Sequence, residues 1–273
     1  MTDVHELVGP ATGRTCRSIV SGVMGLAVRH GAVIANPTRE LERLSSQPKR
    51  RPRSLTDSER ARWFAALAAD EIAIRRDLFD LSAFLLATGL RIGEELAVVW
   101  REVDLESGEL MITSTLLRVT GKGLIRKHTK SEAGERVLVL PTWCVAILRK
   151  RQAVGVGDDE PVFGSVDGTF RDPRNVTRWM AQARERHGFD SWVTFHAWRK
   201  TTATVLDGAG ATARMIADQL GHSRVSLTQD VYLGRRSRES RVVAALESAD
   251  PGRSTAIRGA IRGVQPASDN GGE

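Results

Sequence analysis

The chain has 273 residues, of which 41% are hydrophobic and 27% are charged. This composition is typical of a globular protein with one good core and room for a small second unit. Forty Lys and Arg residues against thirty-three Asp and Glu give a net charge of +7, which favours a polyanionic partner such as nucleic acid. No window approaches the roughly 18 apolar residues that cross a bilayer, and no secretory signal opens the chain, so membrane insertion and secretion are not expected.

The two cysteines also limit the kinds of site that the chain can form. Cys16 and Cys144 are the only cysteines, and neither belongs to a C-x-x-C pair. This spacing offers neither a disulfide framework nor a zinc knuckle. We therefore expect a reducing, cytoplasmic setting.

The first part of the chain predicts a short helical unit followed by a linker. Residues 12–31 carry apolar side chains at helical spacing, and Asn36-Pro37 predicts a turn after them. The run Gln47–Arg53 has two prolines, four basic residues and no apolar one, which predicts an extended linker. This linker is either a solvated connector or a strap across a phosphate backbone. The predicted parts are a helical segment 1–45, a basic linker 46–54, a main domain 55–248 and a disordered tail 249–273.

The main domain is expected to be mostly helical with a β insert. Thr56–Glu59 forms a capping box that predicts a helix to about Ala69, and a second helix is predicted to end near Gly89. From Val103 to Pro141 the pattern changes to short β-rich runs between glycine-containing turns, which predicts a small antiparallel sheet. Helical spacing then resumes to about Ala245. The predicted class is α+β, mostly α with a small antiparallel β-sheet insert.

Two segments of the main domain carry arginines in suggestive places. Arg91 follows a glycine-terminated helix, where its side chain can project into a cleft or simply pair with Glu94 at i,i+3 on the surface. His196 and Arg199 are three residues apart and so share a helix face, where both can address one phosphate. The alternative is an exposed helix start, and a zinc site is disfavoured because His196 has no histidine at i±3 or i±4.

Tyr232 is the only tyrosine, which suggests a chemical role rather than a packing role. It follows His222 by ten residues in a basic stretch. The segment Ala211–Tyr232 also resembles a helix-turn-helix reader of DNA, which is the simpler nucleic-acid interpretation. Lys130 lies at the mouth of a predicted hairpin, where most lysines are solvated charges.

Five motifs in order resemble the tyrosine recombinase (phage integrase) family. They are T-G-L-R-I-G-E at 88–94, T-K-S before V-L-V-L-P at 129–141, H-A-W-R at 196–199, L-G-H at 220–222 and D-V-Y at 230–232. The resemblance covers about residues 55–248, and over the whole chain it extends to integrases of actinobacterial prophage type. It implies the tyrosine recombinase catalytic-domain fold.

The resemblance implies a site-specific DNA recombinase or integrase in which Tyr232 attacks the scissile phosphate. The products would be a 3′-phosphotyrosyl bond and a free 5′-hydroxyl. Arg91 and Arg199 would hold the non-bridging oxygens, where charge gathers during phosphoryl transfer.

The remaining roles implied by the family concern protons and positioning. Lys130 would protonate the departing 5′-oxygen, and His196 would handle the Tyr232 proton, since a free phenol has a pKa of about 10. His222 would hydrogen-bond the phosphate. Glu94 would orient Arg91 or His222 without reacting.

The family also implies the partners. Neither a metal nor another cofactor is expected, because arginines, a lysine and histidines supply the positive charge and the phosphotyrosine stores the bond energy. The expected partner is double-stranded DNA, bound by a homotetramer, with no membrane. Expected DNA contacts are Lys49, Arg50, Arg51 and Arg53 of the linker and Lys200, which stands where many relatives have histidine.

Two other functions remain open from the sequence. Family members carry a full helical core-binding domain, and residues 1–45 resemble only part of such a SAM-like module. A non-catalytic DNA-binding remnant of a prophage integrase would therefore also fit, and it predicts that Tyr232→Phe changes nothing. A type IB topoisomerase-like enzyme would share the chemistry but need no specific site.

Overall fold

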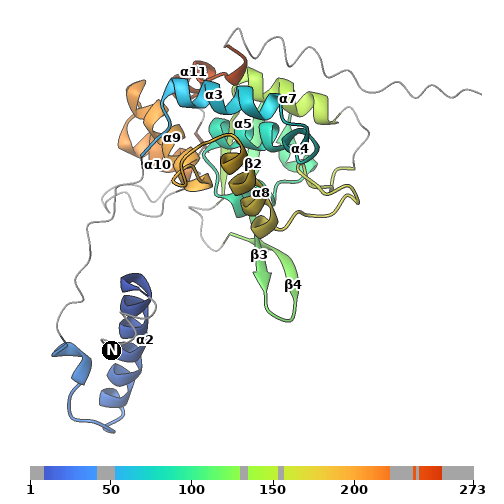
Figure 1. Cartoon of the computed structure of the whole chain (residues 1–273). Helices are drawn as coiled ribbons and strands as arrows, with labels where there is room; N and C mark the ends of the chain where they lie inside the picture. The colour runs from blue at the N-terminus through green and yellow to red at the C-terminus, as the bar shows by residue number, and fades with distance from the viewer. Residues whose placement is uncertain are drawn as a thin grey trace, which may run out of the picture. The chain divides into compact units, whose positions relative to one another are not determined.

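The computed structural model describes residues 9–41, 53–129, 135–152, 157–221, 236–237 and 240–253. The chain divides into two compact units, Met1–Arg51 and Pro52–Glu273 (Figure 1). Within the described ranges, no helix combines the length and apolar character needed to cross a membrane.

The first unit is built around one long helix, as the sequence predicts. Helix α2 spans Pro10–Arg29, and the 3-10 turn η1 spans Pro37–Arg39. The turn is held by Asn36, whose side chain accepts from the Thr38 backbone and donates to the Ser21 carbonyl at 3.0 Å. These bonds fold the turn back along α2. Large apolar side chains of α2 are exposed nevertheless: Ile19, Val23 and Leu26.

The second unit is mainly helical. Its helices are α3 (Asp57–Ala68), α4 (Glu71–Arg75), α5 (Leu78–Thr88), α6 (Ile92–Glu95), α7 (Thr142–Gln152), α8 (Pro173–Arg186), α9 (Phe195–Gly208), α10 (Ala213–Leu220) and α11 (Ser240–Glu247), with 3-10 turns η2 (Trp100–Glu102) and η3 (Pro251–Arg253). The predicted capping box of α3 is confirmed, because Thr56 and Glu59 bond reciprocally.

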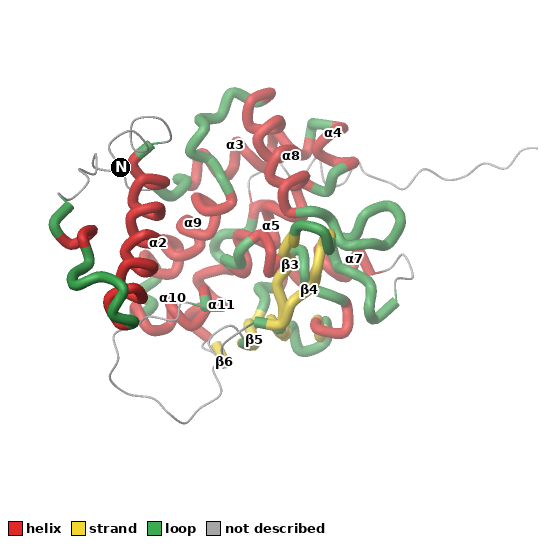
Figure 2. The backbone as a smooth tube through the Cα atoms, turned by 90° about the horizontal axis from the view of Figure 1, so that it is seen from below, coloured by secondary structure: helices red, strands yellow, loops and turns green. Residues whose placement is uncertain are grey.

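The core of the second unit surrounds α5. This helix is almost entirely apolar and nearly all of its residues are buried, as expected for a helix covered on all sides. It packs directly against α9 (Figure 2). Trp63 and Phe64 of α3 contact Trp198 of α9, so α3 covers the same layer. The end of α5 is thereby fixed relative to α9.

The antiparallel β insert that the sequence predicts is confirmed, but its strands form two separate pieces. One sheet has the order β1-β2-β5-β6, and a separate two-stranded hairpin pairs β3 with β4. The first three strands are antiparallel, but β6 runs parallel to β5. Parallel strands cannot be joined by a tight turn, and β5 and β6 are far apart in the chain. The strands are β1 (Val103–Asp104), β2 (Glu109–Ile112), β3 (Ser114–Val119), β4 (Gly123–His128), β5 (Arg136–Val139) and β6 (Arg236–Ser237).

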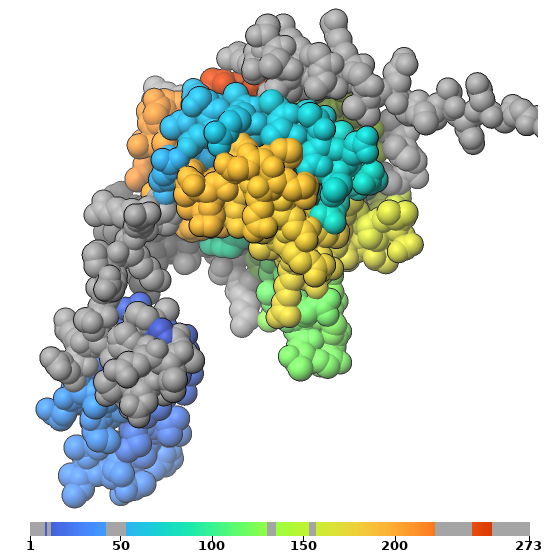
Figure 3. Space-filling model, viewed as in Figure 1, coloured from blue at the N-terminus to red at the C-terminus, as the bar shows by residue number. Residues whose placement is uncertain are grey.

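The hairpin of β3 and β4 projects from the second unit (Figure 3). The hairpin is nevertheless anchored to the rest of the unit. Arg126 of β4 donates to the Ala97 carbonyl at 2.9 Å and to the Glu102 carboxylate at 2.6 Å, and Arg118 of β3 pairs with Asp172 before α8.

The expected disordered tail begins later than residue 249. Ala249 and Pro251 are buried, and turn η3 packs on α3. These residues close one side of the core, so the tail prediction is wrong for residues 249–253; residues 254–273 lie outside the described ranges.

Candidate active site

Two helix C-termini meet at a pair of glycines. Helix α5 ends at Gly89 and helix α10 ends at Gly221, both in the left-handed conformation with φ of 66°. A Cβ on Gly89 would lie 2.4 Å from Cδ2 of Leu220, and one on Gly221 would lie 2.5 Å from Nη1 of Arg136. Glycine is therefore required at both positions by conformation and by space.

Arg199 of α9 joins these two helix ends. Its Nη1 donates to the Gly89 carbonyl and its Nη2 to the Leu220 carbonyl, each at 2.6 Å, and the residue is 6% exposed. Carbonyl groups at helix C-termini have no partner within the helix and favour a cation. The guanidinium of Arg199 satisfies one such carbonyl on each helix.

Arg91 stands at the N-terminus of α6, beside Glu94. The Glu94 carboxylate accepts from the Arg91 backbone at 3.1 Å and from Nη1 of the Arg91 side chain at 2.8 Å. The Glu94 side chain is 6% exposed, whereas that of Arg91 is 52% exposed. The buried carboxylate thus orients an arginine that still reaches solvent.

Arg136 is a member of this cluster that the sequence interpretation missed. Its side chain is only 1% exposed, and its Nη2 donates to Oε2 of Glu94 at 3.2 Å while its Nε donates to the Gln219 carbonyl at 3.1 Å. The signal was available, because strand alternation puts Arg136 on the same buried face as Leu138. A buried arginine on a strand requires a specific partner.

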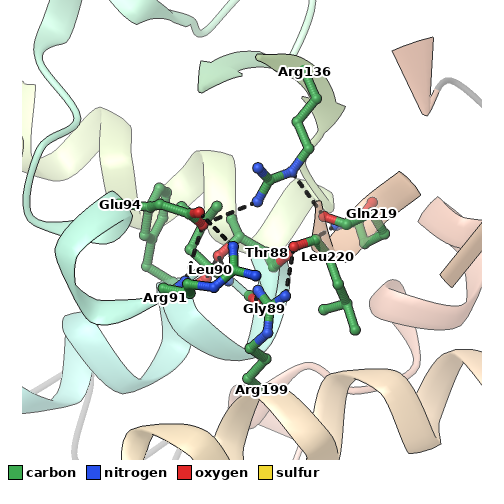
Figure 4. A network of polar contacts seen from close by, with 10 residues as sticks. Thr88, Gly89, Leu90, Arg91, Glu94, Arg136, Arg199, Gln219 and Leu220 are labelled. Atoms are coloured by element: carbon green, nitrogen blue, oxygen red, sulfur yellow. Dashed lines mark hydrogen bonds and ion pairs between the residues drawn. The ribbon is translucent and has the colours of Figure 1, made fainter. Parts of the chain in front are cut away.

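Positive charge exceeds negative charge where these side chains meet (Figure 4). Burial lowers the pKa of Arg199 to about 10, and the nearby guanidinium groups of Arg91 and Arg136 lower it as well. The charge of Glu94 acts in the opposite direction. Burial and the charge of Arg91 also lower the pKa of Arg136, although Glu94 opposes this. Three guanidinium groups therefore share one carboxylate and repel one another.

The carboxylate of Glu94 is held in its ionised form. Burial alone would raise the pKa of Glu94, but Arg136 and Arg91 outweigh burial and leave that pKa below its ordinary value. With Glu94 charged, the cluster has an excess of two positive charges. An anion with several acceptor oxygens, such as a phosphate group, would relieve the repulsion and match the guanidinium geometry.

The other predicted site residues are placed as follows. His196 is exposed in the first turn of α9, whereas Arg199, one turn later, is buried. Lys200 is partly buried on the same helix. Arg53 forms an ion pair with Glu59 and lies over the Trp192 ring at 4.2 Å. The residues outside the described ranges are Lys49, Arg50, Arg51, Lys130, His222 and Tyr232.

The end of the predicted linker is attached to the second unit. The Leu55 backbone donates to Oγ1 of Thr201 on α9 at 2.9 Å. Together with the contacts of Arg53, this bond fixes the chain beside α9, two residues beyond Arg199. In the part of the chain that the structure describes, no group of three or more His, Cys, Asp or Glu side chains is arranged to hold a metal ion.

The comparisons with known proteins identify the family to which this fold and this arginine cluster belong. Residues 53–238 match the phage integrase family, and the chain belongs to it. The tyrosine recombinase XerC of Rhizobium meliloti is 32% identical over 194 residues, which are 70% of this chain and 57% of the relative. XerC of Mesorhizobium japonicum is 30% identical over 249 residues, which are 88% of this chain and 74% of the relative. The chain thus spans little more than half the length of the first of these relatives.

Solved structures confirm the predicted tyrosine recombinase catalytic-domain fold. The Tn1549 transposon integrase in complex with a circular intermediate DNA superposes with a TM-score of 0.72 at 17% identity, covering 81% of this chain and 74% of that one. A lambda integrase tetramer bound to a Holliday junction gives a TM-score of 0.59 at 18% identity, covering 85% of this chain and 64% of that one.

Proposed function

We propose that this chain is a site-specific DNA recombinase that cuts and rejoins DNA through a covalent 3′-phosphotyrosine at Tyr232. The observation that carries the proposal is that Arg91 and Arg199 lie in one cluster, in which Glu94 is the one described carboxylate beside three guanidinium groups (Figure 4). Membership of the phage integrase family supports it, as do relatives named tyrosine recombinases.

In the proposed reaction, the Tyr232 oxygen attacks phosphorus and the bond to the 5′-oxygen breaks. The phenol proton passes to His196, and Lys130 gives a proton to the departing 5′-oxygen. Arg91 and Arg199 stabilise the charge that develops on the non-bridging oxygens, already fixed before the reaction begins. A 5′-hydroxyl from another strand then attacks the phosphotyrosine, which restores the phosphodiester and releases Tyr232.

Chain connectivity supports these assignments. His222 directly follows Gly221, which lies against Arg136. After Tyr232 the chain re-enters the described part at Arg236, which pairs with Val137 next to Arg136. The tyrosine is thus only four residues away in the sequence from a strand that pairs beside Arg136.

The proposed partners follow from this chemistry. Double-stranded DNA would be held by a tetramer in which two cleaved sites exchange strands, as in the lambda integrase tetramer on a Holliday junction. Lys49, Arg50, Arg51, Arg53 and Lys200 would contact its phosphates. The Arg53 contact requires release of its pairing with Glu59. If the substrate is chromosomal or plasmid DNA, the protein would act in the bacterial cytoplasm. An actinobacterial prophage origin stays a prediction.

The test uses a pool of nicked suicide duplexes with randomised core sequence, incubated with the protein in EDTA. Wild type is expected to form an adduct that resists denaturation, and Tyr232→Phe to form none. Recovered adducts should be enriched in one core sequence. A wild type that binds DNA without an adduct would instead favour the non-catalytic remnant, and adducts without sequence preference would favour the topoisomerase-like enzyme.

A further inference from the structure

Arg136 links three of the described elements of the site. It comes from β5, its guanidinium contacts α6 through Glu94, and it contacts α10 through Gln219. We propose that Arg136 is a positioning residue of this site, which fixes the directions of Arg91 and Arg199 by holding the Glu94 carboxylate and the C-terminal end of α10 together. The role of Arg136 in recombination rests on the proposed function. Its role in anion binding does not depend on that function.

The first half of the argument concerns Glu94. Its Oε1 accepts from Arg91, and its Oε2 accepts from Arg136 and from the Arg91 backbone. Arg91 is half exposed, so by itself it holds the carboxylate weakly. The buried guanidinium of Arg136 holds the carboxylate from the protein side. Without it, the only described ionic partner of Glu94 would be a solvent-exposed side chain.

The second half concerns the end of α10. Successive carbonyls of that helix end accept from different arginines, Gln219 from Arg136 and Leu220 from Arg199. The Gln219 side chain in turn donates to the Thr88 carbonyl at the end of α5, 3.2 Å away. A shift of Arg136 would therefore move the end of α10. The Leu220 carbonyl, which is one of the two carbonyls that orient Arg199, would move with it.

An arginine is needed for this geometry. A guanidinium donates in several fixed directions within one plane, so it can bond a carboxylate on one element and a carbonyl on another. A lysine concentrates its donors at one point and does not reproduce both bonds. Gly221 leaves the space for this group, because any side chain there would collide with the Arg136 guanidinium.

The chain contains a matched control. Arg126 on β4 has the same bonding pattern, with Nη2 donating to the Glu102 carboxylate at 2.6 Å and Nε donating to the Ala97 carbonyl at 2.9 Å. It is also largely buried. Its partners lie outside the arginine cluster. Arg126→Met therefore reports the loss of a buried, paired guanidinium without loss of the proposed positioning.

The first experiment measures anion binding without any reaction. Full-length wild type, Arg136→Met and Arg126→Met are unfolded thermally at increasing concentrations of inorganic phosphate. Arg91→Ala gives the shift due to phosphate bound elsewhere, which is subtracted. We expect Arg126→Met to retain the phosphate-dependent shift and Arg136→Met to bind phosphate at least about tenfold more weakly. Equal phosphate affinity in the two methionine variants would overturn the proposal.

The second experiment measures the rate of adduct formation on a saturating suicide duplex. Misplacement by a fraction of an ångström is expected to slow Arg136→Met by about tenfold to a hundredfold, with duplex affinity within about twofold of wild type. Arg126→Met should stay within about twofold of the wild-type rate. Similar rates for the two variants would contradict the positioning role. Absence of an adduct in wild type would instead overturn the proposed function, and the phosphate titration would still decide on Arg136.

Arg136→Lys keeps the test decisive if Arg136→Met does not fold. Lysine preserves the charge and most of the volume but not the two-directional bonding. We expect a folded Arg136→Lys protein that forms adducts at least about fivefold more slowly than wild type. A folded lysine variant with the wild-type rate and phosphate affinity would show that charge alone is needed, which overturns the positioning role.

Discussion

At the residue scale, two adjacent glutamates have opposite electrostatic environments. Glu94 is buried against two arginines, while Glu95 is completely buried and its carboxylate has no hydrogen-bond partner among the described residues. Burial raises the pKa of Glu95 well above its ordinary value of 4.5. Burial also raises the pKa of the Cys144 thiol, and the Glu95 carboxyl group adds to this increase.

Glu95→Met is expected to stabilise the protein in a pH-dependent way. Because the folded-state pKa of Glu95 is raised, the contribution of Glu95 to stability is most favourable below the unfolded value of 4.5 and is lost as pH rises through the folded value. Methionine fills the same space without this penalty. Urea unfolding should show a gain of about 1–3 kcal/mol at pH 8 and a smaller change at pH 4.

Glu94→Gln is the natural control, because it is expected to change the free energy of unfolding in the opposite direction. The pKa of Glu94 is lowered, so its contribution to stability is present above 4.5 and lost as pH falls through the folded value. Glutamine should therefore destabilise the protein at pH 8 and less so at pH 4. A Glu95→Met variant with no gain at pH 8 would mean that the carboxyl group has a partner in solution.

The glycine at the end of α5 gives a second residue-scale prediction. Gly89→Ala imposes a strained left-handed backbone and a collision with Leu220, whereas Gly188→Ala imposes a similar backbone strain in open space. We expect Gly188→Ala to cost about 1 kcal/mol and Gly89→Ala clearly more, by urea unfolding. Equal costs would show that the two helix ends are not in close contact.

The sequence predicts part of this site. Arg91, Glu94 and Arg199 are predicted from motifs that resemble the recombinase family, and the structure brings these three residues together (Figure 4). Arg136 was missed because its strand was interpreted for its apolar residues alone. Its partners lie 42 and 83 residues away in the chain, so only the folded topology reveals why a buried strand position holds an arginine.

At the element scale, the β3–β4 hairpin packs on the helix that carries Arg91. A Cβ added to Gly93 of α6 would lie 2.6 Å from Oγ1 of Thr115 and 3.0 Å from the Leu116 carbonyl. Gly93 thus permits the backbone of β3 to approach α6. The packing of β3 on α6 therefore depends on the absence of a side chain at position 93.

Gly93→Ala is expected to destabilise the protein although alanine is the better helix former by about 1 kcal/mol. The collision with the β3 backbone should produce a net loss of about 1–2 kcal/mol and weaker phosphate binding. Gly22→Ala in α2 meets nothing within 4 Å and should be neutral or stabilising for its own unit. Both changes are measurable by thermal unfolding, and a stabilised Gly93→Ala would contradict close packing of β3 on α6.

Elements with strong local signals were predictable, and those with long-range causes were not. The capping box of α3 and the apolar run of α5 follow from neighbouring residues. Strand β6 is only Arg236–Ser237, which has no β signal of its own, and pairs with a strand about a hundred residues earlier. The parallel pairing therefore depends on the course of the helices between them.

At the scale of the whole molecule, the two units differ in how well they are packed. The second unit has a continuous core around α5. In the first unit, Gly13 and Thr38 are the buried residues among those whose burial is described, and Ile19 of α2 is 62% exposed. Helix α2 contains three glycines and several β-branched residues, which are poor helix formers, so tertiary packing has to supply most of its stability.

Hydrogen exchange on the full-length protein should therefore separate the two units. Amides of α2 are expected to exchange at least about a hundredfold faster than those of α5, because helix opening in the first unit exposes little additional apolar surface. Measurements at two protein concentrations provide the control. Protection of α2 equal to that of α5 and rising with concentration would mean that a second copy covers Ile19, Val23 and Leu26 in solution. Equal protection at both concentrations would mean that contacts within the chain cover them.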